Sequence, residues 1–322
     1  MLWRLSDNIV DRNLALEFVR VTEAAAIAAA RWIGRGDGKI ADGAAVDEMR
    51  DRFSGIDFRG TVVIGEGAKD EAPELYIGET LGTANAPELD IAVDPLECTD
   101  SVANGRPNAI SVIATGAKGS LFHAPDMYMN KIACGPAAKD VIDLDASVEQ
   151  NLQKVAEKLG KTIDELVVIV LDRPRHEQLI SQIRKTGARV RLITDGDVAG
   201  AIAPSLPDSG IDLLMGVGAS AEAVLASVAI KCLGGGFQAR LAPKNAEQEQ
   251  LLRDMGIADA TKKLLLEDLA KGEDLTFTAT GVIDGPLLKG VRYTSERCIT
   301  HSVVMRVRSG TVRFIETQHR LS

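Results

Sequence analysis

The chain is poor in aromatic residues and in basic charge. Aromatic residues make up 4% of its 322 residues, and 37 Lys and Arg stand against 46 Asp and Glu, which gives a formal net charge of −9. Proteins that bind nucleic acid need a basic surface and often use aromatic rings on which bases stack. The composition therefore argues against nucleic acid as a partner.

Cysteines and long apolar runs are also scarce. The four cysteines are far apart and form no CxxC pair, which is typical of reduced thiols rather than of a disulfide framework or a sulfur metal site. The longest apolar runs, 24–30 and 166–171, are far shorter than the roughly 18 residues that a membrane helix needs. Charges interrupt the N-terminal segment, so we expect no secretory signal and a cytoplasmic protein.

The apolar residues that are present are arranged in helix and strand patterns. Apolar positions four and three apart predict a helix between Leu14 and Trp32, and the run Thr61–Ile64 predicts a strand. From Ser147, where a possible capping box Ser147-Val148-Glu149-Gln150 opens a helix, helical patterns such as 177–185 alternate with strand patterns. This alternation predicts a largely parallel sheet covered on both faces. Near the C-terminus, two strand-like segments flank Ser309-Gly310 as in a β-hairpin. The length suggests two domains or one large α/β unit.

Acidic residues lie beside glycines in several segments that we expect to be loops. Glu66 follows the strand at 61–64, and Asp94 ends the apolar run 89–93. Carboxylates at the carboxyl ends of strands point into the crevice where α/β folds bind ligands. Clustered there they would repel one another and need a hard divalent cation such as Mg²⁺ or Mn²⁺. The alternative, an ordinary turn residue or helix cap, applies to each acid taken alone.

The segment Asp94-Pro95-Leu96-Glu97-Cys98-Thr99 has the parts of a phosphate-hydrolysing site. Asp94 and Glu97 can both hold a metal, and Thr99 offers a hydroxyl that can position a water. Free N–H groups at a following helix start would suit a phosphate. Together with the earlier A-D-G and G-E-G motifs, this pattern predicts a metal site.

A longer series of motifs resembles the class II fructose-1,6-bisphosphatases, which belong to the lithium-sensitive sugar and inositol phosphatase superfamily. The motifs occur in family order over nearly the whole chain: G-R-G-D, A-D-G-A-A-V, V-I-G-E-G, D-E-A-P-x-L-Y-I-G-E, A-V-D-P-L-E-x-T, A-P-D-M-Y-M, R-P-R-H and D-G-D-V. The resemblance implies an α/β fold, layered α-β-α-β-α with two sheet-containing halves. It also implies metal-dependent hydrolysis of the 1-phosphate of fructose 1,6-bisphosphate to fructose 6-phosphate in gluconeogenesis, with Mn²⁺ or Mg²⁺ as cofactor, in a homodimer or homotetramer.

The resemblance also implies residue roles at the matching positions. The implied metal ligands are Asp42, Glu66, Asp94, Glu97 and Glu222. The implied catalytic residues are Thr99, which would orient the attacking water, and Asp70, which would support the first metal. The implied substrate contacts are Glu97, Cys98, Thr99, Tyr128, Arg173, Pro174, Arg175, Asp195, Gly196, Asp197 and Ala219. We therefore expect residues 1–160 to form a metal-binding and catalytic half, and residues 161–322 a substrate-binding α/β half that ends in the hairpin.

Elementary chemistry supports the substrate roles. Arg173 and Arg175 can grip a phosphate with forked donors, and Asp195 and Asp197 can accept hydrogen bonds from sugar hydroxyls. Taken alone, the arginines would be a surface charge cluster and the two aspartates part of a tight turn. His176 shows no ligand spacing, and we assign it no catalytic role.

Cys98 departs from the family, which usually has glycine at this position. Either the loop tolerates the side chain or activity is reduced, because glycine permits backbone conformations that a side chain hinders. A thiol there can also make activity sensitive to oxidation, or simply fill space.

Three alternatives for the function stay open: additional activity on sedoheptulose 1,7-bisphosphate, activity on an inositol phosphate, and a noncatalytic sugar-phosphate sensor.

Overall fold

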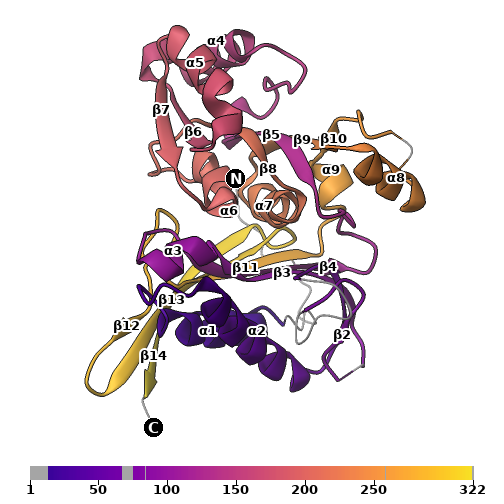
Figure 1. Cartoon of the computed structure of the whole chain (residues 1–322), viewed down its shortest axis with the longest axis vertical. Coiled ribbons are helices and arrows are strands. Elements are labelled where there is room, and N and C mark those ends of the chain that lie inside the picture. Colours follow the sequence, from indigo (N-terminus) through magenta and orange to yellow (C-terminus); the bar gives the residue numbers. More distant parts are fainter. Residues whose placement is uncertain (1–13, 67–74, 84, 258, 321–322) are drawn as a thin grey trace, which may run out of the picture.

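The computed structural model describes residues 14–66, 75–83, 85–257 and 259–320. These residues form five layers in the order helix, sheet, helix, sheet, helix, which are stacked along the long axis of the molecule in Figure 1. The layered α/β fold expected from the sequence is confirmed. No helix in the described ranges is long and apolar enough to cross a membrane.

The first sheet combines strands from the two ends of the chain. Within the described residues its eight strands are β1 (Arg59–Ile64), β2 (Thr80–Leu81), β3 (Glu88–Glu97), β4 (Ile110–Ala117), β11 (Leu275–Gly281), β12 (Arg292–Tyr293), β13 (Arg297–Arg306) and β14 (Thr311–Arg320). Their order is β12-β13-β11-β4-β3-β1-β2, with β14 paired to β13. β1 and β3 are parallel, and the other neighbours are antiparallel. The β13–β14 pair is the hairpin predicted around Ser309-Gly310.

Helices α1 (Ala15–Ala30) and α2 (Gly38–Ser54) cover the outer face of this sheet. Phe18, Phe53 and Phe58 pack ring against ring there, with centroids between 5.5 and 6.2 Å apart. The apolar pattern predicts a helix only from about residue 44 to residue 53. Helix α2 begins earlier, at Gly38, because the Asp37 side chain accepts a hydrogen bond from the Ile40 N–H and caps it. Asp42 therefore lies on a helix, whereas the glycines around it predicted a loop.

The second sheet is mixed rather than largely parallel, which corrects the prediction. Its strands in the described chain are β5 (Tyr128–Cys134), β6 (Val167–Leu171), β7 (Arg189–Ile193), β8 (Leu213–Ala219), β9 (Gly236–Ala242) and β10 (Leu264–Leu265). Their order is β10-β9-β5-β8-β6-β7. Only β6, β7 and β8 are parallel neighbours, because β5 arrives from the first sheet and lies between β8 and β9, antiparallel to both.

Helices α6 (Asp197–Ile202) and α7 (Ser220–Leu233) lie between the two sheets. α7 contacts β3, β4 and β11 of the first sheet and β5, β8 and β9 of the second. Between Ala223 and Ile230 every residue is buried, and all of them are small or apolar, as expected for a helix covered on both sides.

Helices α4 (Val148–Leu159) and α5 (Glu177–Lys185) cover the outer face of the second sheet, and α4 begins at the predicted capping box on Ser147. The remaining described helices are α3 (Thr99–Asn104), α8 (Ala246–Asp254) and α9 (Leu266–Leu269).

The sheets do not divide the chain at residue 160. β5 and α4 precede that residue but belong to the second sheet and its cover, whereas β11 to β14 follow it and complete the first sheet. The layer of α6 and α7 is where residues from the two parts of the chain meet.

Candidate active site

The end of β3 brings two acids into one site through an irregularity in strand pairing. Asp94 pairs with Val112 and Glu97 with Ile110, so β3 uses one more residue than β4 over this step. In a regular strand, residues three apart point to opposite faces. Pro95 cannot donate a hydrogen bond to a neighbouring strand and is suited to such a bulge. The extra residue therefore allows Asp94 and Glu97 to point into the same site.

The predicted metal ligands come from four different elements. Asp42 lies on α2, Glu66 follows β1, and Glu222 lies in the first turn of α7. Burial raises the pKa of Asp94 well above its usual value, and nearby carboxylates raise it further: Glu66, Glu97, Glu222 and Asp42. The fold thus gathers acids that are as much as 180 positions apart in the chain, from 42 to 222.

Two oxygens in this cluster are buried without a hydrogen-bond partner. They are Glu97 Oε2 and Glu222 Oε2, whereas Glu97 Oε1 accepts a hydrogen bond of 2.7 Å from the Val198 N–H. Burial raises the pKa of both glutamates. Buried carboxylate oxygens that lack partners are costly unless a cation binds them.

The donor set fits a hard divalent cation. Carboxylate oxygens are the ligands that Mg²⁺ and Mn²⁺ prefer, and the two orphaned oxygens are available to such an ion. Across the described ranges, no three His, Cys, Asp or Glu side chains are drawn together tightly enough to form a ready-made metal cage.

A cationic rim lies beside Tyr128, at the start of β5. The Arg175 guanidinium lies 4.6 Å from the centroid of the Tyr128 ring, and Lys244 Nζ lies 3.9 Å from it. Arg175 also donates through Nε and one terminal nitrogen to the Val217 carbonyl, at 3.1 and 2.9 Å. Because arginine carries five N–H donors, it keeps donors for a phosphate. Arg173 is the other cation near this rim, with a terminal nitrogen 4.0 Å from Asp195 Oδ1.

The turn between β7 and α6 carries the predicted sugar contacts. Asn108 Nδ2 donates to the Asp195 carbonyl at 3.1 Å, and Gly196 has a φ of +92°. A Cβ at Gly196 would lie 1.7 Å from Asn108 Nδ2, so only glycine fits this turn. Asp197 begins α6 and forms a buried ion pair with Lys131 of β5. The turn is therefore held by Asn108 at the Asp195 carbonyl and by Lys131 at the Asp197 carboxylate.

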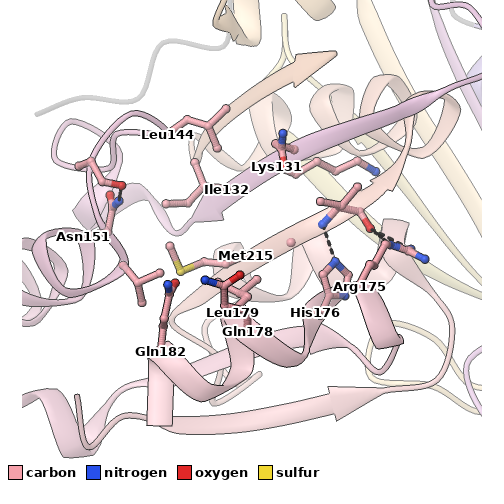
Figure 2. A pocket seen from close by; sticks show the side chains of 15 residues that line it. Lys131, Ile132, Leu144, Asn151, Arg175, His176, Gln178, Leu179, Gln182 and Met215 are labelled. Carbon is pink, nitrogen blue, oxygen red and sulfur yellow. Dashed lines mark hydrogen bonds between the residues drawn. The ribbon is translucent and has the colours of Figure 1, made fainter. Parts of the chain in front are cut away.

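His176 is a structural link next to the predicted phosphate-binding arginines. Its Nδ1 lies 2.7 Å from the Leu171 carbonyl. Its Nε2 accepts a hydrogen bond of 2.8 Å from the Val217 N–H, the dashed line at His176 in Figure 2. This pattern requires the neutral ring with its proton on Nδ1, and burial lowers the pKa of His176 accordingly. Both ring nitrogens are thus engaged with backbone, which is consistent with the absence of a catalytic assignment.

The other predicted residues are placed as follows. Pro174 begins a short 3₁₀ turn, and Ala219 ends β8 directly opposite Tyr128. Asp70 lies outside the described residues. Sequence reasoning overlooked Lys131, Asn108 and Lys244. Lys131 could have been noticed as a lysine within the strand-like segment 128–134.

Cys98 has a backbone conformation that glycine adopts more readily than other residues. Its φ and ψ are +77° and +50°, in the left-handed region that side chains disfavour. The side chain is 6% exposed, and burial raises the pKa of the thiol. A buried, protonated thiol is a poor nucleophile. The geometry therefore favours a space-filling role for Cys98 over an oxidation switch.

We expect Cys98→Gly to leave stability almost unchanged. Relief of left-handed strain, worth roughly 1–2 kcal/mol, offsets the loss of a small buried side chain. The matched control is Cys134→Gly, because Cys134 is equally buried but lies in regular strand β5. There the same substitution should cost roughly 2–3 kcal/mol. Urea unfolding measures both changes, and equal losses would show that Cys98 is unstrained.

Comparison with known proteins finds similar proteins over nearly the whole chain. Residues 12–319 match the family model described as bacterial fructose-1,6-bisphosphatase, glpX-encoded. The chain is 45% identical to a D-fructose 1,6-bisphosphatase class 2/sedoheptulose 1,7-bisphosphatase of Synechococcus sp. (strain JA-3-3Ab), over 96% of each chain. It is also 45% identical to a fructose-1,6-bisphosphatase class 2 of Haemophilus influenzae (strain ATCC 51907 / DSM 11121 / KW20 / Rd), over 97% of each chain.

A solved structure, an extragenic suppressor from Pyrococcus furiosus, matches 58% of this chain and 68% of its own with a TM-score of 0.30 and 11% identity. This likeness is too weak to support an argument. The family match covers nearly the whole chain and the motifs that carry the site. The chain therefore belongs to the bacterial class II fructose-1,6-bisphosphatase family and is a phosphoric monoester hydrolase.

Proposed function

We propose that the site between the two sheets removes the 1-phosphate of fructose 1,6-bisphosphate and releases fructose 6-phosphate. The observation that supports this most is that the site has two parts of opposite charge. One part is the acid cluster, in which Glu97 Oε2 and Glu222 Oε2 are buried without a hydrogen-bond partner. The other is the cationic rim at Tyr128 and Arg175. A bisphosphate with one phosphate near each end matches this division of charge. We place the reaction in the cytoplasm, in gluconeogenesis, and in a homodimer or homotetramer.

The acids are proposed to bind Mn²⁺ or Mg²⁺, with Asp42 and Glu66 at one position and Asp94, Glu97 and Glu222 at the other. Divalent cations bound there would neutralise the negative charge that develops on the transferred phosphoryl group. Burial raises the pKa of Asp94, Glu97 and Glu222, so protons compete with the cation for these carboxylates. The affinity for metal should therefore fall as the pH is lowered.

The remaining residues bind and orient the substrate. Thr99 orients the attacking water through its hydroxyl, and a neighbouring carboxylate takes the proton of that water. Arg173 and Arg175 hold the phosphate that is not cleaved. Asp195 and Asp197 accept hydrogen bonds from the sugar hydroxyls. No covalent bond between enzyme and substrate is needed in this scheme.

Phosphate release assays test the proposal. The purified protein is given fructose 1,6-bisphosphate, sedoheptulose 1,7-bisphosphate or inositol 1-phosphate, with Mn²⁺ or Mg²⁺ and with a chelator. We expect release from the fructose ester that stops with chelator and returns with metal, and phosphorus NMR should identify fructose 6-phosphate as the product. Release that resists the chelator would contradict the metal sites, and no release from any substrate would favour the sensor.

A further inference from the structure

Lys131 is a buried cation in the active site that neither the motifs nor the family resemblance assigns a role. It lies in the middle of β5, paired with Gly216 of β8 on one side and Ala239 of β9 on the other. Its side chain is 2% exposed and forms an ion pair with Asp197 Oδ2. Lysine is rarely buried to this degree, and when it is, it is paired.

The structure is built closely around this ion pair. A Cβ at Gly218 would lie 1.9 Å from Asp197 Oδ2 and 2.9 Å from Lys131 Nζ. Because Gly218 has no side chain, the Asp197 carboxylate and the Lys131 ammonium can occupy this space. The need for glycine here comes from this close approach, because the φ of Gly218 is not in the left-handed region.

The backbone next to Asp197 is also held by a residue of the first sheet. The Val198 N–H, directly after Asp197, donates to Glu97 Oε1 at 2.7 Å. The start of α6 is therefore fixed between Lys131 of the second sheet and Glu97 of the first. Lys131 holds one oxygen of the Asp197 carboxylate, and this also fixes the direction in which the other oxygen points.

We propose that Lys131 is a positioning residue that fixes the Asp197 carboxylate for hydrogen bonding to the sugar hydroxyls of the substrate. The inference rests on the proposed function of Asp197. Lys131 acts through that carboxylate and does not touch the substrate, since its side chain is almost entirely covered. It also supplies the positive charge that keeps Asp197 from repelling an anionic sugar.

A double-mutant cycle tests the proposal. The variants are Lys131→Met, Asp197→Asn and the two together, assayed on fructose 1,6-bisphosphate with saturating metal, and fructose 6-phosphate binding is measured by calorimetry. We expect each single variant to raise KM and the Kd of fructose 6-phosphate roughly 10- to 100-fold. kcat should change much less, since Asp197 binds ground state and transition state alike. The double variant should be no worse than Asp197→Asn alone.

A matched control and a second variant separate positioning from general damage. Lys231→Met removes a lysine that is paired with Glu267 far from the site, and it should leave KM unchanged. Gly218→Ala keeps both charges but displaces the carboxylate, so it should raise KM as Lys131→Met does. It serves as the test if Lys131→Met does not fold.

Each other outcome has a distinct meaning. Additive effects in the double variant would overturn the proposal, since Lys131 would then act independently of Asp197. An unchanged KM in both Lys131→Met and Gly218→Ala, with a raised KM in Asp197→Asn, would also overturn it. An unchanged KM in Asp197→Asn would remove Asp197 from the proposed function and Lys131 with it, whereas an inactive wild-type protein would refute the proposed activity itself.

Discussion

Replacing Glu97 by glutamine should nearly abolish phosphate release and at the same time stabilise the metal-free protein. Glu97 belongs to the acid cluster and is 4% exposed. We expect kcat/KM on fructose 1,6-bisphosphate to fall by about 10³-fold, because the divalent cation that would neutralise charge on the transferred phosphoryl group loses one of its proposed carboxylate ligands. The Oε1 atom of glutamine can still accept the hydrogen bond from the Val198 N–H, so the start of α6 should stay in place.

The gain in stability follows from the unpartnered second oxygen of Glu97. Glu97 Oε2 is buried without a hydrogen bond, and burial followed by the charges of Glu222, Asp197 and Asp195 raises its pKa above the ordinary 4.5. A neutral amide with neighbouring carboxylates as acceptors should be more stable by about 1–3 kcal/mol, the usual cost of a buried polar group without a partner.

The gain should also depend on pH in a defined direction. A folded-state pKa above the unfolded value means that the wild-type protein loses stability as the pH rises from 4.5 toward the raised pKa. Glutamine does not titrate, so the difference between variant and wild type should grow over this range and then level off. Chelator is present throughout to keep metal from masking the effect.

Glu88→Gln is the control for this experiment. Glu88 begins the same strand β3, but it is exposed and pairs with Lys118 at the surface. It should change neither activity nor stability measurably. A Glu97→Gln protein less stable than wild type in chelator would show that the carboxylate makes favourable contacts, and would contradict the repulsive cluster described here.

Replacing Thr99 by valine should slow turnover roughly 10²- to 10⁴-fold, the range expected when a hydroxyl that assists proton transfer is removed. Thr99 is the first residue of α3, directly after the left-handed Cys98. Its backbone also packs against the start of α2, where a Cβ at Gly38 would lie 3.3 Å from the Thr99 carbonyl oxygen. Thr99 therefore lies between the strand with Asp94 and Glu97 and the helix with Asp42.

Thr99→Ser is the matched control, because it keeps the hydroxyl and removes only a methyl group. It should retain most of the turnover. Binding of Mn²⁺, followed by the loss of its electron paramagnetic resonance signal, should be the same in wild type and both variants. Full turnover by Thr99→Val with unchanged metal binding would remove Thr99 from the mechanism.

Local sequence signals predicted many of the elements that support the site. The helix at 177–185, the capping box at Ser147 and the strand that ends before Glu66 all occur as expected, whereas the strand expected to end before Asp94 continues through it to Glu97. Their signals are short-range, because capping and apolar periodicity depend on neighbours within one or two turns. Strands β5 and β11 were overlooked. In β5 the buried Lys131 interrupts the apolar pattern that would mark a central strand.

The acid cluster was predicted as a group only through the series of motifs. The residues by themselves indicated a metal site at D-P-L-E, but nothing in the spacing of Asp42, Glu66 and Glu222 indicates that they meet. Their proximity depends on α2, β1, β3 and α7 packing around one point, which is a property of the five layers. The metal itself and each residue's role stay predictions.

The sequence alone determined the chemistry that is available: acids without matching bases, a proline that favours a bulge at β3, and motifs specific enough to predict the family. Only the tertiary structure decided which carboxylates lie together, that Cys98 adopts a left-handed conformation, and that a lysine from β5 pairs with Asp197. The physical reason is that residue type and short-range periodicity are local, whereas burial and charge pairing depend on strands from distant parts of the chain. β5 shows this most clearly, since its insertion between β8 and β9 both breaks the parallel order and carries Lys131 to the site.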